Sequence, residues 1–360
     1  MKFGLIAVGD AKARTNVLNS SEQTRSTSGA VTNAPTFALI PDEVNEFFPP
    51  SLQERAQTHY RESVWLNPGA PSYPQLESAT VLVGAWRLRD IPIDFLKSRG
   101  GNLEYLCLLV GSPKRSITRK HIEEGLLVTN WGNVCSPNIA EGALTLILSR
   151  LRVIYRYRDE LVRLGKWNNI RAETATLMGK RVSIHGFGNL ARALIRLLKP
   201  FNVSIAVYAP GVPVELIRAV GAVAVDSLFH LAENCDVFVE AEALRADNHG
   251  CINQCVLSRL PIGSVFVNVA RGALVNEVDL VQVAKDRDLK VALDVYQQEP
   301  LPSDSPLFSI PDVLLLPHMS GPTKDIRWIC GELALDNLNL YYAGQQPKNV
   351  IGLQEFDRIT

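Results

Sequence analysis

Short apolar runs alternate with polar, helix-like stretches along most of the chain. In the first part of the sequence, the apolar runs have the length and composition of buried β-strands. The predicted strands cover residues 36–40, 79–84, 105–110 and 125–129, and a short helix is predicted over 93–96. Strands spaced by helices pair in parallel through right-handed crossovers, so this region predicts an α/β domain.

A long helical pattern follows, from about Asn138 to Leu164, with apolar residues at spacings of three and four. Gly165, directly after it, is a typical residue at the C-terminal end of a helix. A helix of this length can bridge two domains and offer its outer face to a partner subunit. An ordinary core helix would show the same pattern, so both interpretations stay open.

A glycine-rich turn opens a second series of strands and helices. The strand predicted over 180–185 leads into Gly186-Phe187-Gly188-Asn189-Leu190-Ala191, and a helix over 192–198 follows. Gly186 permits a tight turn, Gly188 lets a pyrophosphate approach the backbone, and the helix N-terminus favours an anion. This order predicts a dinucleotide site, and a turn with a purely structural role is the alternative. The predicted cofactor-binding residues here are Gly186, Phe187, Gly188, Asn189 and Leu190. His185, just before them, is predicted to be a packed strand residue.

The strand predicted over 203–208 should end in an acidic residue that binds the hydroxyls of the adenosine ribose. Ala209 occupies that position, and no Arg or Lys follows closely to favour a 2′-phosphate. The sequence therefore leaves NAD and NADP both open. We favour NAD, because a phosphate without a cationic partner would be poorly held.

Composition and charge narrow the class of protein. The chain has 360 residues, enough for two domains, with 37 basic and 37 acidic side chains. The balance argues against nucleic acid or an anionic membrane as partner, because both usually recruit a basic excess. The six cysteines form no CxxC pair and no complete zinc pattern, which favours reduced thiols and no bound metal.

Two further features of the sequence concern the cellular location of the protein and the flexibility of its N-terminal segment. No apolar run reaches the roughly 18 residues of a membrane-spanning helix. The N-terminus imitates a signal peptide, but its apolar stretch is short and Asp10 interrupts it, so we expect a cytoplasmic protein. Residues 10–35 are rich in Ser, Thr and Asn and poor in large apolar residues, so 1–35 is predicted to be a flexible segment.

Three later stretches decide the family. They are 266–275 with Arg271, 291–300 with Asp294 and Glu299, and 316–323 with His318. Together with the glycine-rich turn, they resemble the NAD-dependent D-isomer-specific 2-hydroxyacid dehydrogenases over about residues 75–350. The resemblance implies an α/β fold of two Rossmann-like domains, each a doubly wound parallel sheet. A dinucleotide-binding domain (144–324) would be inserted into a discontinuous, flavodoxin-like substrate domain (36–143 and 325–360).

The residue types suit the reduction of a 2-oxo acid. His318 can supply the proton, because an imidazole titrates near working pH. Glu299 can hydrogen-bond the other ring nitrogen, and the Arg271 guanidinium matches a carboxylate. The family implies these three catalytic roles, and the resemblance also places Ala270 and Asp294 with the cofactor. Singly, each residue has a structural alternative: an ion pair for Arg271, a solvated loop for Glu299 and a backbone cap for His318.

Two loops depart from the family pattern. After the strand around 236–242, the usual Pro-Leu-Thr is replaced, and Arg245 either contacts the cofactor or faces solvent. In the first domain, the family binds the substrate carboxylate with backbone amides of a glycine-rich loop, and here Pro113 lacks an amide hydrogen. We expect the Gly111 and Ser112 amides, with Lys114 as an added charge, to bind substrate. Trp131 either shapes the pocket or packs in the core.

The sequence therefore predicts an oxidoreductase that transfers a hydride between NAD, with NADP not excluded, and a small D-2-hydroxy or 2-oxo acid. Family members are commonly dimeric, so we expect a homodimer with the 138–164 helix at its interface. The alternative is a catalytically weak regulatory protein of the same fold that binds NAD(H). The substrate side chain is not predicted.

Overall fold

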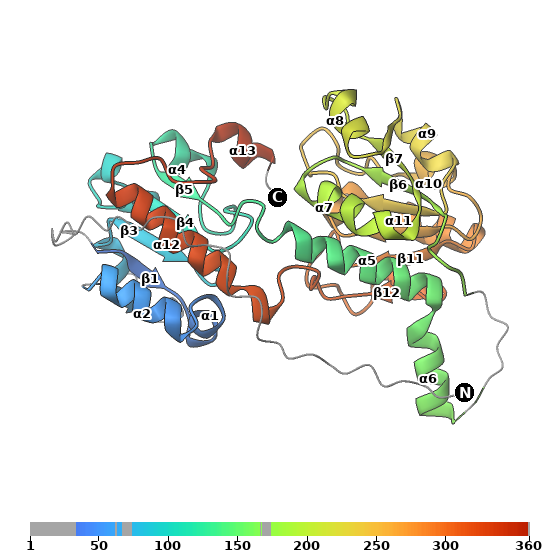
Figure 1. Cartoon of the computed structure of the whole chain (residues 1–360), viewed down its shortest axis with the longest axis horizontal. Helices are drawn as coiled ribbons and strands as arrows, with labels where there is room; N and C mark the ends of the chain where they lie inside the picture. The colour runs from blue at the N-terminus through green and yellow to red at the C-terminus, as the bar shows by residue number, and fades with distance from the viewer. Residues whose placement is uncertain (1–33, 62, 67–73, 166, 168–173, 359–360) are drawn as a thin grey trace, which may run out of the picture. The chain divides into compact units, whose positions relative to one another are not determined.

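The computed structural model describes residues 34–61, 63–66, 74–165, 167 and 174–358 (Figure 1). The flexible segment predicted over 1–35 lies, apart from its last two residues, outside the described residues. The described chain is an α/β protein with two parallel sheets, as predicted. None of the helices among the described residues is long and apolar enough to cross a membrane.

The first sheet has five strands in the order β2-β1-β3-β4-β5, which is the flavodoxin-like arrangement. Its strands are β1 (Thr36–Ala38), β2 (Val64–Leu66), β3 (Val81–Gly84), β4 (Tyr105–Leu108) and β5 (Leu127–Thr129). The associated helices are α1 (Pro41–Phe47), α2 (Pro50–His59), α3 (Pro74–Glu77), α4 (Arg119–Glu123), α12 (Trp328–Tyr342) and α13 (Leu353–Arg358).

The core around this sheet is built from two separated parts of the sequence. Apolar side chains between Phe37 and Cys135 pack with others between Cys330 and Phe356, and all of the latter except Ile351 lie on α12 or α13. The segment between the two parts forms the second sheet and its helices. One domain is therefore inserted into the other, as the sequence predicted.

The second sheet has seven strands in the order β12-β11-β10-β9-β6-β7-β8. They are β6 (Arg181–His185), β7 (Ser204–Tyr208), β8 (Val223–Ala224), β9 (Val237–Glu240), β10 (Val265–Asn268), β11 (Lys290–Leu293) and β12 (Leu314–Leu315). The helices are α5 (Ser136–Arg152), α6 (Ile154–Leu164), α7 (Asn189–Leu198), α8 (Val214–Ala219), α9 (Leu228–Glu233), α10 (Gln254–Leu257) and α11 (Glu277–Asp286). The order reverses between β6 and β9, where doubly wound sheets bind their ligands.

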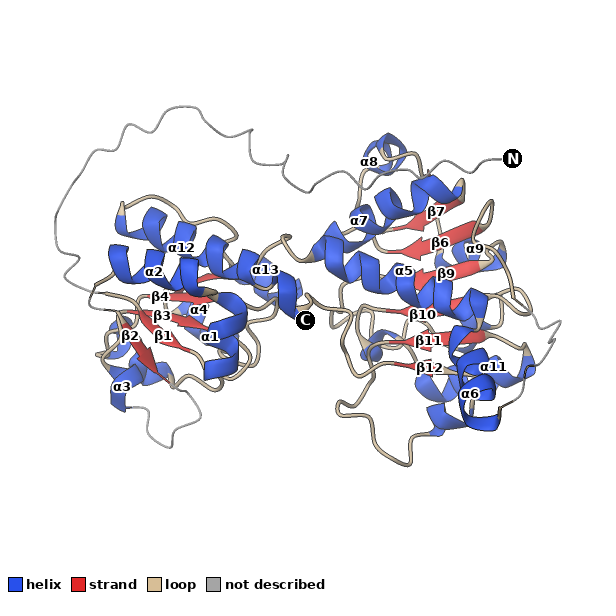
Figure 2. Ribbon diagram, turned by 60° about the horizontal axis from the view of Figure 1, so that its bottom comes forward, coloured by secondary structure: helices blue, strands red, loops and turns tan. Residues whose placement is uncertain are grey.

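Helices cover both faces of this sheet (Figure 2). In β10, Val265 and Val267 belong to the core that includes α5 and α7, whereas Phe266 lies in the core that includes α9 and α11. This follows from the two-residue period of a strand. Both faces are buried, so the strand reads as a continuous apolar run, as expected for parallel strands.

The predicted strands over 36–40, 79–84, 105–110, 125–129, 180–185 and 203–208 each contain an observed strand. Two helix predictions were wrong in detail. The stretch 93–96 forms only a short 3₁₀ turn, Ile93–Phe95, directly after Pro92. The long helix over 138–164 is broken into α5 and α6 at Val153, whose φ is +52°.

Tertiary contacts explain the break at Val153. The Tyr155 hydroxyl donates to the carbonyl of Asp312 at 2.6 Å, and Arg156 Nη1 lies 3.1 Å from the Asp312 carboxylate. Arg150, in the last turn of α5, also hydrogen-bonds the Tyr155 hydroxyl. These contacts redirect the chain. Gly165 ends α6 with φ +60°, which confirms it as the C-cap.

Candidate functional site

The glycine-rich turn joins β6 to α7 at the point where the strand order reverses. Gly186 has φ +96°, and a Cβ built there would lie 2.7 Å from the Glu242 Cα, so only glycine fits without strain. Gly188 is the N-cap residue of α7, and no side chain caps this helix end. A Cβ built on Gly188 would meet nothing within 4 Å. The helix end is thus an open backbone surface with amide donors, which fits a dinucleotide pyrophosphate.

The side chains of the turn have structural roles. Phe187 is buried in the α5–α7 core, and the Arg192 guanidinium lies 4.8 Å from its ring centroid. Leu190 packs against the same core while Asn189 is exposed. Of the residues predicted from this motif, Phe187 and Leu190 therefore offer backbone rather than side chain to a ligand. Ala209 follows β7, is buried, and its carbonyl accepts from the Val212 amide at 3.2 Å.

A buried asparagine that the sequence analysis did not single out shapes the loop after β10. Asn268 Oδ1 accepts from the Ala270 amide at 3.0 Å, and its Nδ2 donates to the Arg271 carbonyl at 3.0 Å. Gly272 follows, with its Cα against the Tyr296 backbone. Arg271 Nη1 donates to the Ala270 carbonyl at 2.6 Å, and burial lowers the pKa of Arg271. An Asn as the last residue of a buried strand was the available signal.

Asp294, directly after β11, holds the segment that carries His318. Its Oδ1 accepts from the Met319 amide at 2.7 Å and its Oδ2 from the Ser320 amide at 3.0 Å. The residue is buried, and burial raises its pKa despite these bonds. Tyr296, which was not predicted from the sequence either, also holds this segment, because its hydroxyl donates to the Leu316 carbonyl at 2.7 Å.

The structure brings His318 and Glu299 together. Their atoms Nδ1 and Oε2 are 2.7 Å apart, and Glu299 Oε1 accepts from the Tyr296 amide at 3.2 Å. Burial tends to raise the pKa of Glu299, but the hydrogen bond and charge of His318 outweigh it and hold that pKa below its usual value. His318 has φ +51°, a left-handed backbone conformation that residues other than glycine rarely adopt. The hydrogen bonds that Asp294 and Tyr296 make to the neighbouring backbone hold this conformation and therefore the position of the His318 ring.

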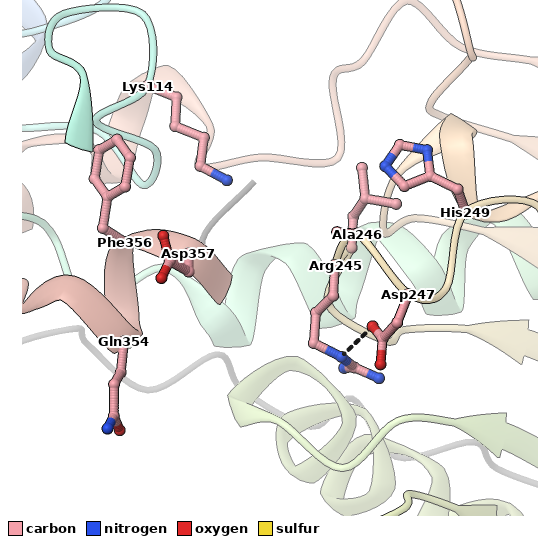
Figure 3. Close-up of a pocket in the computed structure, with 9 residues that line it drawn as sticks. Lys114, Arg245, Ala246, Asp247, His249, Gln354, Phe356 and Asp357 are labelled. Carbon is pink, nitrogen blue, oxygen red and sulfur yellow. Dashed lines mark hydrogen bonds and ion pairs between the residues drawn. The ribbon is translucent and has the colours of Figure 1, made fainter. Parts of the chain in front are cut away.

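The loop predicted to bind the substrate carboxylate follows β4. Asn130 Nδ2 donates to the Gly111 carbonyl at 2.6 Å, and a Cβ on Gly111 would meet the Trp131 indole at 2.8 Å. Trp131 is thus packed against this loop. Lys114 is exposed, with its Nζ 5.7 Å from the Phe356 ring centroid (Figure 3). Partial burial lowers the pKa of Lys114.

Arg245 is held within its own loop after β9. Its Nη1 lies 2.7 Å from Glu242 Oε1. Its Nε lies 3.2 Å from Asp247 Oδ1 (Figure 3). Asn248 closes the loop by accepting from the Arg245 amide at 2.7 Å and donating to the Ala243 carbonyl at 2.8 Å. The guanidinium has carboxylate partners, and the loop that replaces Pro-Leu-Thr is internally braced.

Comparison with known proteins gives the family. Residues 144–320 match the model of the D-isomer specific 2-hydroxyacid dehydrogenase NAD binding domain. An uncharacterized protein of Corynebacterium melassecola, from the 3′ region of proB, is 31% identical over 295 residues, covering 76% of this chain and 95% of that protein. Glyoxylate/hydroxypyruvate reductase A of Arabidopsis thaliana is 31% identical over 226 residues, covering 62% of this chain and 70% of that protein.

A solved structure extends the likeness to both sheets. The 2-hydroxyacid dehydrogenase of Ketogulonicigenium vulgare superposes with a TM-score of 0.73 at 22% identity, covering 89% of this chain and 98% of that one. This likeness concerns the fold, whereas the sequence matches identify the family. The chain belongs to the family of D-isomer specific 2-hydroxyacid dehydrogenases.

Proposed function

We propose that this protein is an oxidoreductase that transfers a hydride between a nicotinamide dinucleotide and a small D-2-hydroxy or 2-oxo acid. The observation that carries the proposal is the 2.7 Å contact between His318 Nδ1 and Glu299 Oε2, in the same domain as an open glycine-rich turn. Family membership supports this reaction class.

His318 is the acid–base residue. Because Glu299 engages Nδ1, the other ring nitrogen, Nε2, donates a proton to the carbonyl oxygen in reduction and removes it from the hydroxyl in oxidation. Glu299, whose pKa is lowered, stays ionised and stabilises the imidazolium. The bound nicotinamide supplies or accepts the hydride.

The remaining residues orient the reactants. Arg271 binds the substrate carboxylate and carbonyl through its planar guanidinium. Gly111, Ser112 and Lys114 supply further donors to the carboxylate. On the cofactor side, the turn Gly186–Leu190 receives the pyrophosphate. Three further residues complete the cofactor site. Ala209 lies near the adenosine ribose, Ala270 beside the loop of Arg271, and Asp294 near the carboxamide of the nicotinamide.

NAD is the expected cofactor, with NADP as the second choice. Ala209 offers no carboxylate to the ribose hydroxyls, and the stretch Ala209–Pro213 holds no cation for a 2′-phosphate. A ribose without phosphate leaves no buried charge unpaired there.

The protein acts as a homodimer in the cytoplasm. Helix α6 has no buried residue, and Ile154, Leu161 and Leu164 are exposed at spacings of seven and three along one side of it. An apolar stripe of this kind is typical of a protein interface. For the domains, we set the boundaries at 36–143 and 325–360 for substrate binding and at 144–324 for the cofactor.

One panel of assays tests the function. The protein is incubated with NADH or NADPH and with glyoxylate, hydroxypyruvate, pyruvate or bulkier 2-oxo acids, and loss of the reduced-nicotinamide absorbance is followed. Turnover of at least one acid, faster with NADH, is expected. Dinucleotide binding without turnover across the panel would instead favour a regulatory protein that binds NAD(H).

A further inference from the structure

A buried ion pair lies directly beneath the glycine-rich turn. His185 is the last residue of β6, Glu240 is the last residue of β9, and the two are partners in the parallel ladder. His185 Nδ1 is 2.7 Å from Glu240 Oε2. The exposed fractions are 4% for His185 and 0% for Glu240, so neither charge has solvent to stabilise it. Burying two charges is costly, and hydrophobic residues would serve a merely structural role at least as well.

Glu240 connects this pair to the turn itself. Its second oxygen, Oε1, accepts from the Glu242 amide at 2.9 Å. The Glu242 Cα is the atom that a Cβ on Gly186 would strike at 2.7 Å. The carboxylate therefore fixes the backbone against which the first glycine of the turn packs.

His185 connects the pair to the strand on the other side. Its ring stacks on Tyr208, the last residue of β7, with centroids 5.7 Å apart and an interplanar angle of 19°. The Gly186 amide donates to the Tyr208 carbonyl at 2.8 Å. The ends of β9, β6 and β7, which together flank the dinucleotide site, are thus held by one imidazole and one carboxylate.

We propose that His185 is a positioning residue for the dinucleotide, which in its protonated form offsets the charge of Glu240 beneath the anion site. This inference rests on the proposed function, namely that the turn takes a nicotinamide dinucleotide. His185 touches no reacting atom in this proposal. It acts through the backbone of Gly186 and through its positive charge.

The charges around His185 support this assignment. Burial lowers the pKa of His185, but the charge and hydrogen bond of Glu240 outweigh it, so the net pKa is raised. Glu242 also favours the protonated form, and Arg245, which is paired with Glu242 at 2.7 Å, opposes it.

Two further titratable groups border the pair, namely the Tyr208 phenol on β7 and the Cys251 thiol, whose pKa is raised by burial and, to a smaller extent, by the charge of Glu240. The raised pKa keeps the Cys251 thiol neutral near neutral pH. When His185 loses its proton, the negative charge of the nearby carboxylates is no longer offset, and it repels an incoming pyrophosphate. Affinity should therefore fall as pH rises through the raised pKa.

ADP-ribose is the appropriate probe, because it carries the pyrophosphate and adenosine but has no nicotinamide ring to approach His318. We would measure its Kd by calorimetry between about pH 6 and about pH 9, a range that extends well above the ordinary pKa of histidine. In the wild type, the affinity should decrease on the alkaline side. The His230→Gln variant is the matched control, since His230 is an exposed histidine of the same domain paired with Asp226 at 2.5 Å.

The variants separate charge from shape. His185→Gln leaves the Glu240 charge uncompensated and should weaken ADP-ribose binding at neutral pH by on the order of tenfold. The double variant H185Q/E240Q removes both charges, so its affinity should return close to the wild-type value at low pH and should not vary with pH. Thermal unfolding of each protein without ligand shows whether the fold survives.

Each outcome decides the matter. A double variant that binds no better than His185→Gln, or a wild type whose Kd is constant with pH, would overturn the inference. If His185→Gln does not fold, the comparison of the pH profiles of wild type and double variant carries the test alone. Failure of the wild type to bind ADP-ribose and NADH at any pH would instead contradict the proposed function.

Discussion

His318 Nδ1 lies 2.7 Å from Glu299 Oε2, so the carboxylate occupies one ring nitrogen and leaves Nε2 for a substrate. We expect His318→Ala to reduce kcat by about 10²–10⁴-fold, the usual contribution of a positioned acid–base group. The affinity for NADH should stay near the wild-type value, because the glycine-rich turn is unchanged. Steady-state kinetics check the expected loss of kcat, and a fluorescence titration with NADH checks that the affinity for the dinucleotide is unchanged.

The control for this variant is His59→Ala. His59 is an exposed histidine on α2 that hydrogen-bonds the Arg55 carbonyl of its own helix and lies beside the neighbouring Tyr60 ring. It should keep full activity. Equal kcat for His318→Ala and the wild type would remove His318 from the mechanism.

Glu299 gives a prediction about pH. Its pKa is lowered in the folded protein, so its favourable contribution to stability is complete above its ordinary pKa, near 4.5, and is lost as pH falls through the lowered value. In Glu299→Gln, the thermal unfolding midpoint should therefore fall less steeply with acidification than in the wild type. If the unfolding midpoint of this variant fell with acidification as steeply as that of the wild type, the Glu299–His318 pair would contribute nothing to stability.

Arg271 tests the recognition of the acid. Arg271→Lys keeps a positive charge but loses the planar pair of donors, so kcat/KM for a 2-oxo acid should fall by on the order of 10²-fold. Arg259→Lys is the control, because Arg259 is an exposed arginine of the same domain paired with Glu233. If both lysine variants retain wild-type kcat/KM, Arg271 does not bind the substrate.

The apolar stripe of α6 tests the homodimer. Leu161→Glu places a charge in that stripe and should shift the protein toward a smaller mass in size-exclusion chromatography with light scattering. Arg163→Glu alters the charge on another side of the same helix, at a side chain that is 69% exposed, and should leave the mass unchanged. A wild type that is monomeric at all accessible concentrations would contradict the proposed assembly.

Local patterns were sufficient to predict the elements that position the site. The two-residue period and the glycine-rich turn depend on neighbours in sequence, and β6, α7 and β7 lie where these patterns indicate. The break at Val153 depends on Tyr155 reaching Asp312, which is 157 residues away in sequence. No helical periodicity could reveal that contact.

The site shows the same division between local and distant information. Arg271, Glu299 and His318 could be predicted as site residues because each stands in its own short motif. The bonds from Asp294 to the Met319 and Ser320 amides span 25 and 26 residues, and the His185–Glu240 pair spans 55. Such pairs follow from strand register, which a single sequence does not contain. His185 was accordingly expected to be a packed strand residue, and its charged partner was not foreseen.

The two glycines of the turn should fail in different ways when each becomes alanine. Gly186 has φ +96° and no room for a Cβ, so Gly186→Ala should destabilise the fold by about 1–3 kcal/mol through backbone strain and collision with Glu242. Chemical denaturation without ligand measures this loss.

Gly188→Ala should leave the fold intact and impair binding alone. Gly188 has φ −75° and ψ −168°, a conformation that alanine adopts readily, and its Cβ would point into open space. The free protein should unfold at the wild-type denaturant concentration or slightly above it, since replacing a compatible glycine restricts the unfolded chain. The added methyl group would nevertheless occupy the space that the pyrophosphate needs, so the Kd for NADH should rise by on the order of tenfold, equivalent to about 1.4 kcal/mol. Unchanged NADH affinity in this variant would mean that the phosphates do not approach the backbone at Gly188.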